Sequence, residues 1–130
     1  MRLIKMLGLL ALFGSSSVAL AAVWVQVSQI SHNVREVDKA SIQGAQPILN
    51  FTSRHVIDDA NELKLGRHSV KYLVMRQRAD CAKRTTVVLS TEAQRADMSM
   101  ISKQTLVAQE ETPVLKDSVD EDVLKFVCGG

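Results

Sequence analysis

The stretch "SVKYLVMRQRADC" (69–81) is the longest β-type run in this chain. It is rich in Val, Tyr and Leu, which suit a pleated, half-buried surface. A second run, "TTVVLST" (85–91), follows after a short connection and is strongly β-branched. Two such runs joined by a short loop predict a pair of antiparallel strands, and this pair is the centre of the predicted fold.

Other segments of the chain alternate between apolar and polar residues with the period of two that indicates a strand. In "VWVQVSQI" (23–30), for example, Val23, Val25 and Val27 share one face and Trp24 lies on the other. Pro47 can only begin its strand, because proline cannot donate to a ladder. Segment 35–42 is predicted as a short strand followed by a turn through Asp38, Lys39 and Ala40. The further predicted strands are 47–57, 97–102 and 105–111, with a polar, turn-rich stretch at 58–66. Because no linker or repeat interrupts residues 22–130, we predict a single domain built on an antiparallel meander.

The C-terminal segment "KDSVDEDVLKFVCGG" (116–130) has the pattern of a helix instead. Ser118 and Glu121 have the spacing of a capping box, and Gly129 stands where a left-handed C-cap is expected. An isolated helix of this length is not stable in water, so it must pack on the sheet. The predicted apolar stripe is Val119, Val123, Leu124, Phe126 and Val127. The predicted fold class is α+β, a mainly antiparallel sheet with a short C-terminal α-helix packed on it.

The first 21 residues have the layout of a cleaved secretory signal peptide. Arg2 and Lys5 form a positive start, an apolar run follows, and Ala19-Leu20-Ala21 supplies a cleavage site. The apolar run is shorter than the ~20 residues needed to cross a bilayer, so no stable membrane span is expected after cleavage. Removing Arg2 and Lys5 from the 16 basic residues leaves 14 against 14 acidic ones. The positive charge of the whole chain therefore belongs to the predicted signal peptide and gives no argument for nucleic acid, which we do not expect as a partner.

The chain has two cysteines, Cys81 and Cys128, so only one intramolecular disulfide is available. An exported protein meets an oxidising compartment, where such a bond persists. Closing this loop would stabilise the domain by roughly 4 kcal/mol in the chain-entropy model. Two independent buried thiols, or a catalytic cysteine, remain the alternatives at this stage.

The histidines and methionines are the candidate metal ligands of this sequence. His32, His55 and His68 lack the tight His/Cys spacing of zinc sites, so solvated loop and strand-edge positions are the default. Met98 and Met100 on a strand would project two thioethers to one face, as in copper-handling proteins. Met75 could add a third ligand, but core packing is the commoner use of methionine. We therefore predict no metal site.

The remaining candidate site is the basic stretch "RQRADCAKR" (76–84). Arg76 and Arg78 would share a strand face, and with Lys83 and Arg84 they form a possible patch for a small anion or an acidic partner. A solvated sheet face is the alternative. The sequence has no G-x-S-x-G motif and no glycine-rich phosphate loop, and we predict neither catalysis nor a cofactor.

The order of several short motifs resembles the surface-adhesin protein E family of Gram-negative bacteria. These motifs are Trp24, "REVDKASI" (35–42), a middle strand ending in "ADC" (79–81), and Ser118 followed by Phe126-Val127-Cys128. The resemblance covers nearly all of residues 22–130. It implies an antiparallel sheet with a C-terminal helix tied back through Cys81 and Cys128. It also implies binding of extracellular-matrix proteins, a lipid anchor and dimer formation, although this chain lacks a lipidation cysteine after the apolar run.

These observations predict an exported, non-enzymatic, disulfide-stabilised binding or structural module, either periplasmic or secreted. Its expected partners are proteins of the envelope or the host matrix, and a homodimer is compatible with the resemblance. The alternative function is a periplasmic carrier of a small ligand or copper, using Met75, Met98 and Met100 or the histidines.

Overall fold

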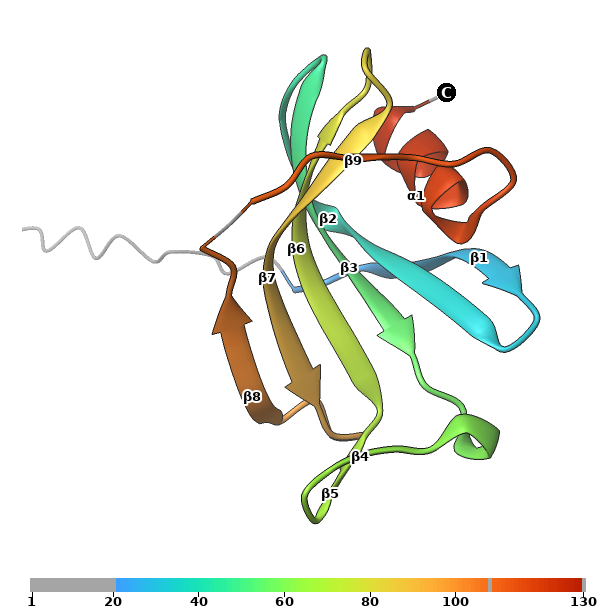
Figure 1. Ribbon diagram of the computed structural model, residues 1–130, viewed down its shortest axis with the longest axis vertical. Coiled ribbons are helices and arrows are strands. Elements are labelled where there is room, and N and C mark those ends of the chain that lie inside the picture. The colour runs from blue at the N-terminus through green and yellow to red at the C-terminus, as the bar shows by residue number, and fades with distance from the viewer. Residues whose placement is uncertain (1–20, 108, 130) are drawn as a thin grey trace, which may run out of the picture.

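The computed structural model describes residues 21–107 and 109–129, which form a strongly twisted antiparallel sheet with one α-helix on it (Figure 1). The predicted signal peptide lies outside the described residues except for Ala21. Six strands follow one another across the sheet, and a short seventh, β9, pairs with the beginning of β7. In sheet order the strands are β1 (Trp24–Ile30), β2 (Asn33–Ala45), β3 (Ile48–Val56), β6 (Tyr72–Asp80), β7 (Thr85–Gln94) and β8 (Met100–Thr105), with β9 at Thr112–Pro113. The predicted α+β class and the antiparallel meander are confirmed.

Between β3 and β6 the chain makes an excursion at one end of the sheet, seen at the bottom of Figure 1. It comprises a 3-10 turn, η1 (Asp59–Asn61), and a separate hairpin of β4 (Leu63–Leu65) and β5 (His68–Val70). The predicted single strand 69–81 is therefore interrupted at Lys71. The backbone N–H of Lys71 donates to the Gln94 carbonyl. Val70 pairs within the small hairpin, whereas Tyr72 pairs with β3 and β7, so the two halves of the run belong to different sheets.

The prediction for 97–102 was wrong in its boundaries, and the predicted strand 105–111 is absent beyond Thr105. The predicted turn through Asp38–Ala40 was also wrong, because β2 continues through these residues with an irregular register. The Asp97 carboxylate accepts hydrogen bonds from the Ser99 backbone and hydroxyl, and Met98 has a left-handed φ of 68°. These contacts make a turn, so β8 begins only at Met100. Beyond Thr105 the described residues up to Glu111 are not in a strand. On this edge of β7, β8 pairs with Ser90–Gln94 and β9 pairs with Thr85 and Thr86, and between them the Leu106 N–H donates to the Leu89 carbonyl.

The C-terminal helix α1 (Val119–Cys128) has the predicted caps. The Ser118 hydroxyl accepts a hydrogen bond from the Glu121 backbone at 3.1 Å, and Gly129 has a left-handed φ of 75°. The capping box is only half formed. The Glu121 carboxylate accepts from the Asp117 backbone and from Arg84 instead of reaching back to Ser118.

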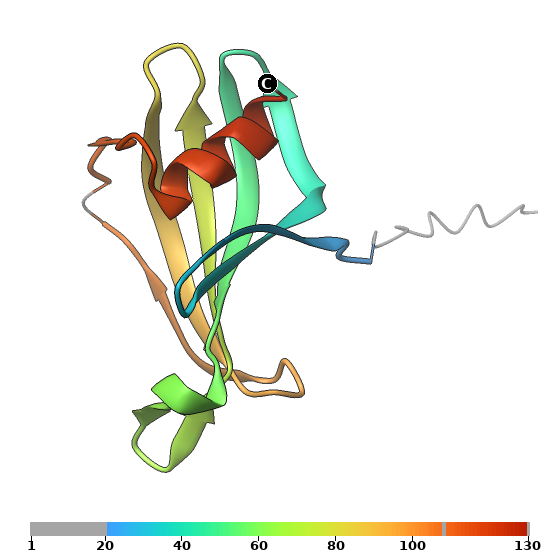
Figure 2. The ribbon, with the colours of Figure 1, turned by 90° about the vertical axis from the view of Figure 1, so that its right-hand side faces the viewer.

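Helix α1 lies across one face of the sheet and packs on β1, β2 and β3 (Figure 2). Val123, Leu124 and Val127 are almost fully buried there, as the predicted apolar stripe requires. Their partners in the core are Val37, Leu49, Phe51 and Ala79. A disulfide joins Cys81, just after β6, to Cys128 in the last turn of the helix. The predicted pairing is confirmed, and neither cysteine is a free thiol.

Candidate binding surfaces

The sheet has one covered face and one open face, because successive side chains of a strand alternate between the two. Leu49 and Phe51 of β3 and Ala79 of β6 point toward α1 and form the core. The even-numbered residues of β3 and β6 therefore lie on the other side, which we call the open face. Among the described residues, α1 is the only α-helix, and it covers the face opposite to this one.

At one end of the open face, the guanidinium of Arg54 lies between two aromatic rings. Its central carbon is 3.9 Å from the ring centre of Trp24 in β1 and 4.1 Å from that of Tyr72 in β6. Its Nε donates to a Glu36 carboxylate oxygen at 3.0 Å, and one terminal nitrogen is 3.9 Å from the Met98 sulfur. We call these five residues the arginine–aromatic cluster. Such stacking is worth ~0.5–2 kcal/mol per ring and holds the side chains rigid.

The arginine–aromatic cluster has the composition of a protein-binding surface. Trp, Tyr, Met and Arg are enriched at the centres of protein interfaces. Trp, Tyr and Arg contribute most of the binding energy there. Trp24 and Tyr72 are partly exposed, while Arg54 is only 7% exposed. The charge of Arg54 is already paired with Glu36, so a partner would meet the ring edges and the methionine rather than an isolated charge.

Further along the open face lies a hollow of about 420 Å³. Three cationic side chains line it, Arg76 and Arg78 from β6 and Lys103 from β8. The polar groups between them are Ser90, Thr105 and Gln109, and Leu89 completes the lining. We call this the cationic hollow. It keeps two members of the predicted basic patch together and adds Lys103, which lies far away in the sequence.

The other two members of the predicted patch have partners elsewhere. Arg84 donates to Glu121 of α1 at 2.6 Å, so it ties the β6–β7 hairpin to the helix on the covered side. Lys83 lies 3.9 Å from a Glu111 carboxylate oxygen. The structure therefore divides the four residues instead of gathering them on one surface. Whether the two that remain together bind a ligand stays a prediction.

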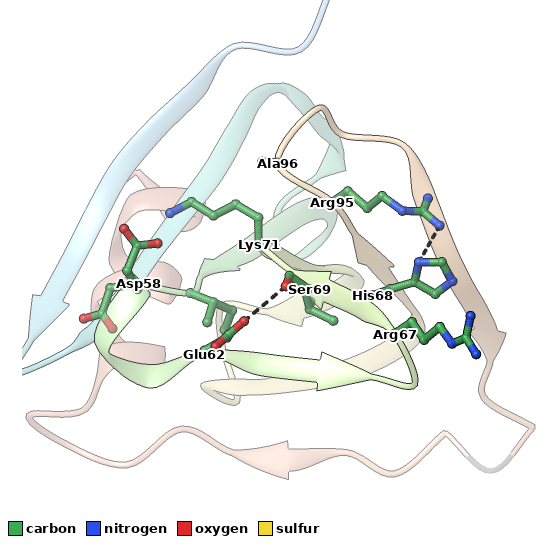
Figure 3. Close-up of a pocket in the computed structure, with 11 residues that line it drawn as sticks. Asp58, Glu62, Arg67, His68, Ser69, Lys71, Arg95 and Ala96 are labelled. Carbon is green, nitrogen blue, oxygen red and sulfur yellow. Dashed lines mark hydrogen bonds between the residues drawn. The ribbon is translucent and has the colours of Figure 1, made fainter.

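A second hollow, of about 640 Å³, lies at the end of the sheet beneath the β4–β5 hairpin (Figure 3). Asp58 and Glu62 lie at one end of it, and Arg67, His68 and Arg95 at the other. Most of its polar groups already bond to protein. One Arg95 nitrogen contacts His68 Nδ1 at 3.1 Å, and the Ser69 hydroxyl donates to Glu62 at 3.2 Å. With charges of both signs at its rim, this hollow favours no particular ligand charge.

On the covered face, a layer of buried polar side chains lies next to the first turn of α1. Arg35, 3% exposed, donates to Asp120 of the helix at 3.1 Å and to Ser53 at 2.9 Å. Ser53 in turn donates to the Gln77 side chain. Burial lowers the pKa of Arg35, and the neighbouring Asp120 opposes that effect. Because a buried charge is costly without a partner, these bonds position the helix on the sheet.

His55 lies beside this layer, and its ring Nδ1 is 3.0 Å from the Asn33 side-chain oxygen. Burial, together with the positive charge of Arg35, lowers the pKa of His55 to about 4. The ring is therefore neutral at physiological pH. His55 and Met75 line a hollow of about 440 Å³. Its charged lining residues are the buried Arg35 and the acids Glu110 and Asp120.

The predicted metal ligands are spread over the molecule. Met75 lines the hollow on the covered face, whereas the Met98 sulfur contacts Arg54 on the open face. His32 pairs with Asp58 at 3.1 Å, and His68 contacts Arg95 in a different loop. Within residues 21–107 and 109–129, no group of three His, Cys, Asp or Glu side chains could hold a metal ion.

Sequence patterns alone missed Arg54, Tyr72 and Lys103 as surface-forming residues. The period-two pattern places Arg54 on the same side of its strand as Asn50, but it does not say what lies across from it. That information is in the strand register, which sets Arg54 opposite Glu36 and Val74.

Comparisons with known proteins bear on the family and the fold of this chain. A family model described as Surface-adhesin protein E matches residues 24–129. Among solved structures, crystal form II of Haemophilus influenzae protein E superposes with a TM-score of 0.56 at 11% sequence identity. That match covers 85% of this chain and 97% of the other. Protein E from non-typeable Haemophilus influenzae gives a TM-score of 0.53 at 10% identity, with 85% of each chain covered. No curated protein sequence matches the chain significantly.

The structural similarity establishes the fold, and the family match spans nearly the whole described structure. Membership of a surface-adhesin family implies an exported or surface protein of adhesin-like type. No helix among the described residues has the length and apolar character required to cross a membrane. The chain belongs to the surface-adhesin protein E family.

Proposed function

We propose that this protein is an exported, non-enzymatic binding module whose open sheet face docks a protein partner. In this proposal residues 1–21 are removed on export, and the remainder acts as one domain held by the disulfide between Cys81 and Cys128. The observation that carries the proposal is the arginine–aromatic cluster, in which Arg54 stacks between Trp24 and Tyr72 on an uncovered sheet face.

Rigidity is the physical reason for placing the binding surface there. Side chains that are ordered before binding lose little conformational entropy when a partner arrives, so their contacts contribute more to affinity. Arg54 is held on four sides by groups from β1, β2, β6 and the β7–β8 turn. The rings of Trp24 and Tyr72 therefore present fixed edges to an envelope or matrix protein, or to a second copy of this chain.

The non-enzymatic part of the proposal rests on how the buried polar groups are used. Arg35 and Asp120 join the sheet to α1, and His55 bonds to Asn33. Both cysteines are in the disulfide. A hydrolytic or redox site would need such groups free to act on a substrate, whereas here they bond to one another.

The test uses a double variant, Trp24→Ala with Tyr72→Ala, and a control, Leu65→Ala, which removes an exposed apolar side chain from the β4–β5 hairpin. Each protein is immobilised and exposed to periplasmic and extracellular-matrix extracts, and the captured proteins are quantified by mass spectrometry. We expect specific partners of the wild type to bind at least tenfold more weakly to the double variant, as for interface hot spots. The control should retain them.

Equal capture by the wild type and the double variant would contradict the assignment of the open face. Circular dichroism at 25 °C must show that all three proteins are folded. Sedimentation of the purified wild type and double variant tests the second copy as partner, because a dimer formed through this face would dissociate in the variant.

A further inference from the structure

The cationic hollow is the second feature of the open face, and it is separate from the arginine–aromatic cluster. Arg76 of β6, Ser90 of β7 and Thr105 of β8 are direct neighbours across three strands. Arg78 lies two residues from Arg76 on the same face, and Lys103 lies two residues from Thr105. Three positive side chains and two hydroxyl groups thus line the same hollow on the sheet.

The three cations differ from the other well-placed arginines of this protein. Arg35, Arg54 and Arg84 each pair with a carboxylate. Within the described part of the chain, the side chains of Arg76, Arg78 and Lys103 have no ion pair or hydrogen bond, and no carboxylate lines the hollow. The acid nearest to Lys103 by register is Glu92, whose carboxylate accepts a hydrogen bond from Gln94. Asp80 lies two residues from Arg78 on the same face, and its carboxylate accepts from the backbone of Ala82 and Lys83.

We propose that the cationic hollow binds a phosphate or sulfate ester group. Three positive side chains in one hollow favour an anionic group, and near neutral pH a phosphate ester carries a charge of about −1 to −2 and a sulfate ester about −1. Its oxygens can accept from two guanidinium groups, an ammonium and the hydroxyls of Ser90 and Thr105 together. The electrostatic repulsion among the cations falls when the ester binds, which adds to its affinity.

The size of the hollow favours an ester over a free inorganic anion. At about 420 Å³ it falls within the range of small-molecule sites, ~300–1,000 Å³. A free anion would fill only a small part of it. The attached group would lie against Leu89 and the Gln109 side chain, which complete the lining. A soluble sugar phosphate, a sulfated saccharide and a phospholipid headgroup all present this chemistry.

The test compares glucose 6-phosphate, glucose 6-sulfate and glucose by isothermal titration calorimetry and by thermal unfolding of the purified protein. Vesicles of phosphatidylcholine with and without phosphatidic acid form a separate arm for a lipid source. We expect at least one ester probe to bind saturably and raise the unfolding temperature, and glucose to do neither. Arg76→Gln and Lys103→Gln should each weaken that binding about tenfold, a loss expected when a charge-assisted contact is removed.

Two further variants separate a site from general surface charge. Lys116→Gln removes an exposed cation outside the hollow and should leave the affinity unchanged. Glu92→Gln removes the nearest acid and should strengthen binding several-fold. The proposal is overturned if no ester probe or anionic vesicle binds, or if Lys116→Gln weakens binding as much as Arg76→Gln does. Saturable binding of the vesicles alone, lost in Arg76→Gln, would identify a lipid headgroup as the ester.

Discussion

The disulfide between Cys81 and Cys128 should decide whether this domain is stable. Replacing both residues by alanine opens a loop whose ends are 47 residues apart in sequence. The bond joins the end of β6 to the last turn of α1, so its loss frees the helix from the sheet at one end. Both cysteines also pack at the edge of the core, beside Val127 and Ala79.

The expected loss of stability follows from the length of the closed loop. In the chain-entropy model, a loop of this length lowers the entropy of the unfolded chain enough to stabilise the fold by about 4 kcal/mol at 25 °C. Domains of this size have total stabilities of roughly 5–15 kcal/mol. The variant should therefore remain only marginally folded. Its urea midpoint should fall by about 2–4 M, given a slope of about 1–2 kcal/mol per molar urea.

Urea unfolding followed by circular dichroism measures this difference directly. The wild type reduced with dithiothreitol is the matched comparison, because it breaks the same bond without changing the core side chains. Each single variant, Cys81→Ala or Cys128→Ala, should lose nearly as much stability as the double variant. If the double variant unfolds within 1 kcal/mol of the oxidised wild type, the entropic reasoning is wrong and α1 is held by packing alone.

Two further predictions concern the covered face and the helix cap. Because the folded pKa of His55 is about 4, below the ordinary histidine value of 6.5, the unfolded state takes up a proton first as the pH falls. The stability from neutral His55 is present above about pH 6.5 and is lost toward pH 4. In His55→Asn the free energy of unfolding should therefore fall by ~1–2 kcal/mol less between these pH values, allowing for partial solvent screening. Urea titrations that show the same pH profile in the variant and the wild type would contradict this prediction. Ser118→Ala removes the acceptor for the Glu121 backbone N–H and should lower the free energy of unfolding by ~1 kcal/mol in the same assay. Ser118→Asp supplies another acceptor and should restore that stability. Equal stability of both variants would mean that the cap contributes nothing.

The open face carries two chemically different surfaces on one rigid support. Tyr72, Arg76 and Arg78 are at alternating positions of β6, so a single strand links the arginine–aromatic cluster to the cationic hollow. A partner that carries both apolar groups and an esterified group could contact both surfaces at once. The variants proposed for the two sites share no residue, so the two activities can be separated by experiment.

Local sequence signals were sufficient for the elements whose structure depends on neighbouring residues. Ser118 and Gly129 bound the helix because their caps satisfy backbone groups only a few residues away. Alternation assigned Trp24 and Val25 to opposite sides of one strand because the pleat has a period of two. The cysteine pair could be assigned because Cys81 and Cys128 are the only two cysteines.

The tertiary structure alone decided which strands lie next to each other and in which register. Trp24, Arg54 and Tyr72 come from three strands, and no local pattern indicates that they stack. Arg84 turns toward Glu121 on the covered side, whereas Lys103 joins Arg76 from a distant strand. The predicted strand at 105–111 was wrong for the same reason, because the places where β8 and β9 pair along the edge of β7 cannot be read from the residues of this segment. Such contacts depend on sheet register and edge availability, which are set by the packing of the whole chain and not by any one segment.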